Sequence, residues 1–145
     1  MHSFFRTAAI VAAATIALSG CAVNRATGNV DPSVDLSVLK TMYVKRIPAD
    51  EETHVLIADK LRTKGVAVST GVEPAPGNVD AVVTYIDKWF WDITMYMLEL
   101  TIVIRDPKTD FPLATGNSYH TSLTRLSPQE MVNEVIDNIY KAGKK

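Results

Sequence analysis

The chain has 145 residues, of which 47% are hydrophobic and 21% charged, and its formal net charge is −1. This composition is typical of a folded protein and the length suits one domain, while the near-neutral charge excludes a polybasic nucleic-acid binder. The single cysteine excludes an internal disulfide framework and a cysteine-rich metal site, and three histidines leave little for a histidine-rich metal centre.

The first twenty residues have the pattern of a secretory signal. Arg6 supplies positive charge, and an apolar run follows over residues 7–18. As a helix this run would be about 18 Å long, whereas the hydrocarbon core of a bilayer is about 30 Å thick. Because the run is too short for a permanent membrane span, residues 1–20 are predicted to be a signal peptide.

The end of this signal, Leu18-Ser19-Gly20-Cys21, resembles the bacterial lipobox. The resemblance implies cleavage between Gly20 and Cys21, a diacylglyceryl group on the Cys21 sulfur, and a further acyl chain such as palmitate on the new amino group. Several acyl chains anchor a protein stably, whereas one holds it only marginally. Ala22, in place of the Asp that resembles an inner-membrane retention signal, favours the outer membrane, with the protein facing the periplasm. The alternative is an ordinary secretory signal with an incidental free cysteine.

The mature chain divides into a predicted tether and one domain. Residues 21–35 hold the lipidated cysteine and a polar stretch with Gly28, Asn29 and Pro32, which is typical of a flexible tether. Residues 36–145 are predicted to form a single domain.

The first half of the domain predicts a strand, a helix and a second strand. Residues 41–47 mix β-branched and aromatic side chains and end at Pro48, which favours a strand. Residues 50–64 predict a helix, because three acidic residues lie at its start and Gly65 follows its end. A short strand is expected over residues 66–70, and the proline- and glycine-containing residues 71–78 form a loop.

The second half predicts three strands and a final helix. Residues 80–91 and 95–105 are β-type runs joined by a tight connection at 92–94, and a weaker strand is expected over 113–124. Ser127, Pro128 and Glu130 form a capping-box pattern that begins a helix ending at Gly143. An apolar stripe marks one face of this helix at Met131, Val132, Val135, Ile136, Ile139 and Tyr140.

This order of elements predicts an α+β fold. Long antiparallel strands adjacent in the sequence favour a two-layer sandwich, with two helices packed on one face of a mostly antiparallel sheet of about five strands.

The most distinctive segment contains Trp89, Phe90, Trp91, Asp92 and Tyr96. It resembles a family of small uncharacterised bacterial envelope lipoproteins that carry a W-x-W-D-x-x-x-Y hairpin. The likeness extends to the D-A-V-V-T-Y strand before the hairpin and to an A-x-G-x-x-Y stretch at residues 114–119. That family has no established activity, so the resemblance implies a fold and a compartment but no reaction.

Two interpretations of the aromatic hairpin remain open. Its rings either seal one end of the core, or form an exposed apolar patch for a protein partner, an acyl chain or the membrane surface. In a strand, Trp89 and Trp91 share one face and Phe90 lies on the other. Asp92 is expected to cap backbone N–H groups of the turn.

Few residues are candidates for catalysis. His54 and His120 lie on different predicted elements and are expected to be surface or packing residues. A pairing of His120 with Ser118 or Ser122, with Asp106 or Asp110 nearby, would be needed for a hydrolase. The sequence contains no nucleophile elbow or glycine-rich oxyanion loop, and the loop at residues 71–77 lacks the ending of a phosphate loop.

The sequence therefore predicts a lipid-anchored envelope protein with a non-catalytic binding or accessory role. No catalytic residue, metal or cofactor is expected apart from the covalent lipid on Cys21, and an envelope protein is the expected partner. The alternatives are a periplasmic hydrolase and a lipid- or peptidoglycan-binding lipoprotein.

Overall fold

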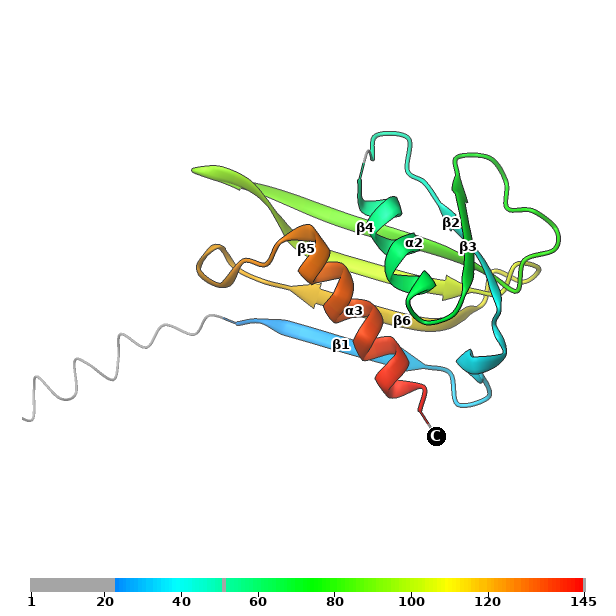
Figure 1. The fold of residues 1–145 in the computed structure, drawn as a ribbon. Helices are drawn as coiled ribbons and strands as arrows, with labels where there is room; N and C mark the ends of the chain where they lie inside the picture. Colours follow the sequence, from blue (N-terminus) through cyan, green and yellow to red (C-terminus); the bar gives the residue numbers. More distant parts are fainter. Residues whose placement is uncertain (1–22, 51, 145) are drawn as a thin grey trace, which may run out of the picture.

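The computed structural model describes residues 23–50 and 52–144, so the predicted signal peptide and Cys21 lie outside the described residues. Two helices, α2 (Thr53–Arg62) and α3 (Pro128–Ala142), cover one face of a six-stranded sheet (Figure 1). The predicted α+β two-layer architecture is confirmed. The strands and the short 3₁₀ turns are β1 (Arg25–Val30), η1 (Leu36–Val38), β2 (Thr41–Lys45), β3 (Ala67–Gly71), β4 (Ala81–Asp92), β5 (Thr94–Arg105), β6 (Pro112–Tyr119) and η2 (Ser122–Thr124).

The sheet is mostly antiparallel, with the strand order β1-β6-β5-β4-β2-β3. Strands β1, β6, β5 and β4 pair antiparallel, whereas β2 pairs parallel to both β4 and β3. The parallel β2–β3 pair is connected through α2, as parallel strands require a crossover. Because β5 pairs antiparallel with both β4 and β6, the β5–β6 turn lies at the opposite end of the sheet from the β4–β5 turn.

The prediction of a flexible tether over residues 21–35 is wrong for its central part. Residues 25–30 form β1, which pairs antiparallel with β6 along the edge of the sheet. Gly28 lies opposite Gly116, and a Cβ atom at Gly28 would be only 2.4 Å from the carbonyl carbon of Asn138 in α3. The glycine therefore makes room for the helix to cross the strand, and it does not serve as a flexible joint.

Of the predicted element boundaries, two differ most from the structure. The first helix begins at Thr53 and not at residue 50, because the Asp50 carboxylate accepts the backbone N–H groups of Thr53 and His54 from outside the helix. The strand expected over 113–124 ends at Tyr119 and is followed by a 3₁₀ turn.

The C-terminal helix is as predicted. Ser127 and Glu130 form a reciprocal capping box at its start, and the apolar stripe from Met131 to Ile139 is buried in the core. Opposite this stripe, the sheet contributes Leu100, Ile102 and Ile104, which alternate along β5. Burial of these two apolar faces against one another provides the main stabilisation of the fold.

Candidate functional site

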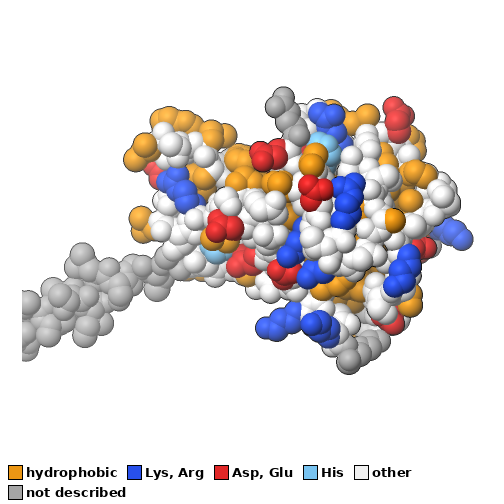
Figure 2. All heavy atoms as spheres, viewed as in Figure 1, with side chains coloured by type: hydrophobic (Ala, Val, Ile, Leu, Met, Phe, Trp, Pro, Cys, Tyr) orange, Lys and Arg blue, Asp and Glu red, His pale blue; other side chains and the backbone are white. Residues whose placement is uncertain are grey.

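The β4–β5 hairpin projects beyond the rest of the sheet (Figure 1). Its neighbours are shorter, since β4 and β5 have 12 residues each, whereas β6 has 8 and β2 has 5. Hydrophobic side chains gather on this projection (Figure 2). We call the segment Trp89–Met95 the hairpin tip.

The aromatic rings of the hairpin tip face solvent. The exposed fractions are 42% for Trp89, 52% for Phe90 and 67% for Trp91, whereas Tyr96 is only 7% exposed. The interpretation in which the rings seal the core is therefore wrong for the tryptophans and Phe90, and it holds for Tyr96 alone. Two further apolar side chains at the tip, Ile93 and Met95, are 84% and 58% exposed.

The cross-strand register sets which rings share a face. Trp91 pairs with Met95 and Phe90 pairs with Tyr96, while an irregularity between Lys88 and Trp89 shifts the register at the base of the tip. The predicted placement of the two tryptophans on one face and Phe90 on the other is confirmed. The Phe90 and Tyr96 rings meet edge to face, with their centroids 6.1 Å apart.

Arg125 covers the buried tyrosine from the loop before α3. Its guanidinium carbon lies 4.6 Å from the centre of the Tyr96 ring, and its Nη1 donates to the Thr94 hydroxyl at 2.8 Å. This pair of contacts fixes the hairpin to the body of the domain.

The turn at the tip is strained. Ile93 has a φ of +61°, a left-handed conformation that β-branched residues rarely adopt. Such a conformation costs about 1–3 kcal/mol unless its surroundings compensate. The Asp92 carboxylate accepts no hydrogen bond from the described residues, so its expected role as a turn cap is wrong.

Two carboxylates that no motif marks as site residues lie near the base of the hairpin. The Asp87 Oδ2 atom accepts the Trp89 indole N–H at 3.1 Å and the Thr53 hydroxyl at 2.8 Å. A pocket of about 400 Å³ lies beside them, lined by residues of the β2–α2 loop, Thr53, Asp87 and Trp89. The orientation of the Trp89 indole is therefore set by the start of α2.

Asp50 is the second of these carboxylates. It accepts the backbone N–H groups of Thr53 and His54, the His54 Nδ1 atom at 3.0 Å and the Tyr85 hydroxyl. Burial alone would raise the pKa of Asp50, but these hydrogen bonds outweigh it and hold the pKa well below its usual range. Burial, together with the hydrogen bond to Asp50, raises the pKa of Tyr85. His54 is buried at this site and is thus a packing residue, as expected.

Ser118 and His120 do not form the hydrogen-bonded pair that a hydrolase would require. The Glu134 Oε2 atom accepts the Ser118 hydroxyl at 2.5 Å and is 2.9 Å from His120 Nε2. The carboxylate therefore lies between serine and histidine, whereas nucleophilic catalysis needs the histidine to accept the serine proton. Ser118 is fully buried.

The other residues of that alternative lie elsewhere. Asp106 and Asp110 belong to the β5–β6 turn, at the opposite end of β6 from His120. His120 is buried and its Nδ1 atom has no hydrogen-bond partner in the described part of the chain, so this histidine is a packing residue, as expected.

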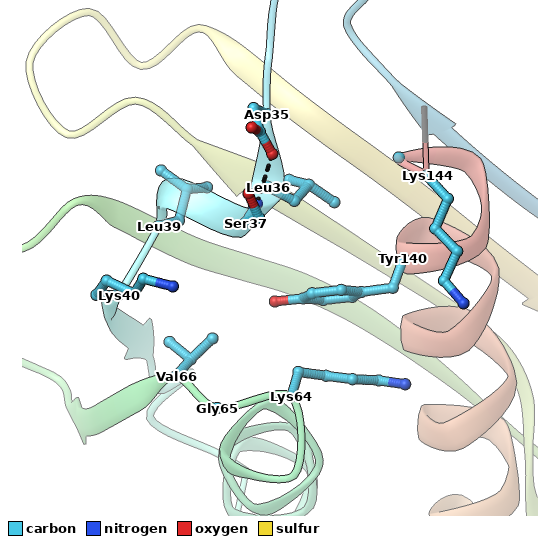
Figure 3. A pocket seen from close by; sticks show the side chains of 11 residues that line it. Asp35, Leu36, Ser37, Leu39, Lys40, Lys64, Gly65, Val66, Tyr140 and Lys144 are labelled. Carbon is cyan, nitrogen blue, oxygen red and sulfur yellow. Dashed lines mark hydrogen bonds between the residues drawn. The ribbon is translucent and has the colours of Figure 1, made fainter.

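A pocket of about 610 Å³ lies at the far end of the sheet from the hairpin tip, near the end of α3 (Figure 3). Leu36, Leu39 and Val66 line it, and the Tyr140 ring extends into it with a hydroxyl that has no hydrogen-bond partner among the described residues. Lys64 at its edge is bound to Asp137 at 2.6 Å. Polar and apolar side chains are mixed along its walls.

Within residues 23–50 and 52–144, no cluster of three or more potential ligands could hold a metal ion. None of the helices described there is both long enough and apolar enough to cross a bilayer.

Comparisons with known proteins find similarity only at the level of structure. No protein-family model and no curated protein sequence matches the chain. PelC from Paraburkholderia phytofirmans, solved as a dodecamer, superimposes with a TM-score of 0.59 at 13% identity, over 81% of this chain and 98% of that one. TolB from Acinetobacter baumannii superimposes with a TM-score of 0.52 at 14% identity, over 82% of this chain but only 30% of TolB. At these identities the likeness shows a shared fold.

Proposed function

We propose that this protein is a lipid-anchored envelope protein of the outer membrane with a non-catalytic, accessory role in an envelope assembly. The observation that carries the proposal is the resemblance of residues 18–21 to a lipobox, in which Cys21 stands three positions before Asn24. The Thr124 hydroxyl donates to the Asn24 side-chain oxygen at 2.5 Å. An anchor on Cys21 would therefore hold the domain directly against the bilayer, with no long tether between them.

The non-catalytic part of the proposal is supported by the arrangement of Ser118, Glu134 and His120. A buried serine that donates to a carboxylate is a structural hydrogen bond and does not have the geometry of an activated nucleophile. The role in an assembly is supported by the shared fold with PelC, which was solved as a dodecamer. This second support is an analogy of fold.

The anchor is tested by expressing the full-length chain in a bacterial host, with the Cys21→Ala variant beside it. We expect wild type to lose residues 1–20, to gain acyl chains on residue 21 by mass spectrometry, and to sediment with the outer membrane. The matched control is Ala22→Asp, which should keep the acyl chains and move to the inner membrane of an enterobacterial host. An unmodified Cys21 in the mature wild type would refute the anchor.

The accessory role is tested by crosslinking the wild-type protein in intact membranes, where discrete larger species are expected. Recovery of the monomer alone would contradict a role in an assembly. The non-catalytic part would be contradicted by an esterase or peptidase activity that Ser118→Ala abolishes and that the matched Ser122→Ala variant retains.

A further inference from the structure

The start of the described chain and the hairpin tip lie at the same end of the sheet (Figure 1). The register aligns Lys88 with Glu99, Glu99 with Tyr119, and Tyr119 with Arg25, so these residues form one row across four strands. β1 runs away from this row, and the chain before Arg25 therefore leaves toward the hairpin side.

The distance by which the hairpin extends past this row is close to the greatest distance that the chain from Arg25 to Cys21 can span. Residues 89–92 extend β4 past the row by about 13 Å, at roughly 3.3 Å per residue. The four steps from Arg25 back to Cys21 span at most about 14 Å. An acylated Cys21 at the membrane surface would thus bring that surface to the level of the hairpin tip.

We propose that the hairpin tip inserts into the interfacial region of the same bilayer that holds the acyl chains of Cys21. This inference rests on the lipid anchor proposed above. Tryptophan is enriched at membrane interfaces because its ring is largely apolar and its N–H is polar. The only two tryptophans of the chain are both in the tip, and Trp91, Ile93 and Met95 are its most exposed apolar side chains.

The residues behind the tip carry the charges that suit a phospholipid surface. Arg25, Lys88 and Arg125 surround the base of the hairpin, and the Arg25 and Lys88 side chains are 57% and 62% exposed although both pair with Glu99. An apolar tip with cationic residues behind it is the pattern of an interfacial anchor. Asp92 in the turn limits the depth, so the tip reaches the boundary between the headgroups and the acyl chains and not the centre of the hydrocarbon core.

A second apolar contact lies at the same end of the domain. Leu123 is 88% exposed in η2. This turn lies beyond the row, separated from the end of β6 by two residues, and it contains Thr124, the residue bonded to Asn24. The strained Ile93 side chain has no packing role in the domain, since it is 84% exposed, and a membrane contact gives this residue a reason to be apolar. With the tip at the membrane, the 610 Å³ pocket near Tyr140 faces away from it.

The native tryptophans allow a direct test with the full lipidated protein. The purified protein is reconstituted into vesicles of phosphatidylethanolamine and phosphatidylglycerol, with or without bromine on the acyl chains, and its tryptophan emission is recorded. We expect a blue shift, loss of emission with brominated lipid, and protection from aqueous iodide. Ile93→Asn, which places a residue that tolerates a left-handed conformation in the turn, should weaken the quenching by brominated lipid.

The matched control is Phe111→Ser, because Phe111 is 50% exposed but lies in the turn at the opposite end of the sheet. Brominated lipid should quench the tryptophan emission of this variant as strongly as that of the wild type. Protein that floats with vesicles while its tryptophans stay open to iodide would overturn tip insertion and leave the anchor intact. Tryptophans protected from both quenchers, in a protein that crosslinks to a second copy, would assign the tip to a protein contact and also overturn the proposal. Absence of acyl chains on Cys21 would refute the proposed anchor and the insertion together.

Discussion

Replacement of Gly28 by alanine tests whether β1 is packed beneath α3. A Cβ atom at this position would lie 2.4 Å from both the carbonyl carbon and the carbonyl oxygen of Asn138, whereas non-bonded carbon atoms prefer separations of about 3.5–4.0 Å. The strand or the helix must therefore move by about 1 Å. The obstacle is helix backbone, so no side-chain rotation can relieve it.

The magnitude follows from two opposing effects. Overpacking of this kind destabilises a protein by about 1–3 kcal/mol, while the lower chain entropy of alanine returns roughly 0.5–1 kcal/mol in a strand. We expect a net loss of about 1–2 kcal/mol, which lowers the melting temperature by roughly 3–8 °C in a domain of this size.

The assay is urea and thermal unfolding followed by far-ultraviolet circular dichroism, with amide hydrogen exchange of the β6 residues that pair with β1. The matched control is Gly77→Ala, because a Cβ atom at Gly77 meets nothing within 4 Å and its effect should stay within about 0.5 kcal/mol. If both alanine variants unfold alike and the β6 amides exchange alike, then β1 is not packed beneath α3 and the segment is a tether after all.

Three further predictions concern polar groups of the fold. Asp50→Ala should destabilise the protein by about 2–4 kcal/mol, because it leaves buried backbone N–H groups and a tyrosine hydroxyl unpaired. The low pKa of Asp50 means that its stabilisation is complete above the unfolded value of about 3.9 and is lost as pH falls toward the folded value, so Asp50→Ala should flatten the acid limb of the stability profile. Ser127→Ala removes the capping box and should cost about 1 kcal/mol in urea unfolding. Tyr140→Phe should leave stability unchanged or slightly raised, because the hydroxyl has no partner in the described structure.

Each of these predictions has an outcome that contradicts it. An acid limb as steep in Asp50→Ala as in wild type would show that this carboxylate is not the group that titrates. For the capping box, Gln129→Ala is the control on the same exposed turn, and equal effects of the two changes would remove the assigned role of Ser127. A loss of more than about 1 kcal/mol in Tyr140→Phe, the net value of an ordinary hydrogen bond, would mean that the hydroxyl is bonded in solution.

The lipid anchor and the membrane insertion of the hairpin tip, both proposed above, would act at the same end of the domain. A long tether would let the domain tumble above the membrane, whereas only two residues separate Cys21 from Asn24, which is hydrogen-bonded to Thr124. Two contacts with one bilayer, from the acyl chains and from the tip, would fix the orientation of the domain. The opposite end of the sheet would then face the periplasm.

Local signals in the sequence were sufficient for the fold class and for most of its elements. Helix α3 could be predicted because the capping box and the apolar stripe both lie within one short segment. The β4–β5 hairpin could be predicted because its strands adjoin in sequence and alternate over Leu100, Ile102 and Ile104. Each of these features depends on neighbours only a few residues away.

Contacts between distant segments were beyond that reasoning. Strand β1 pairs with residues about 90 positions later, and its polar side chains carry no alternation that distinguishes an edge strand from a linker. Asp87 binds the Thr53 hydroxyl, 34 positions earlier, only because the fold brings the start of α2 to β4. Glu134 lies 14 positions after His120 and 16 after Ser118, and it binds both only because α3 packs against β6.

The sequence by itself determined which residues form the aromatic hairpin and how they alternate, because strand geometry is local. Only the tertiary structure decided that the rings are exposed. The strands on either side of the hairpin, β2 and β6, end at Lys45 and Tyr119, so the last residues of β4 extend past them and the rings stay exposed. Whether an apolar side chain is buried depends on what lies against it, and that is a property of the assembled sheet.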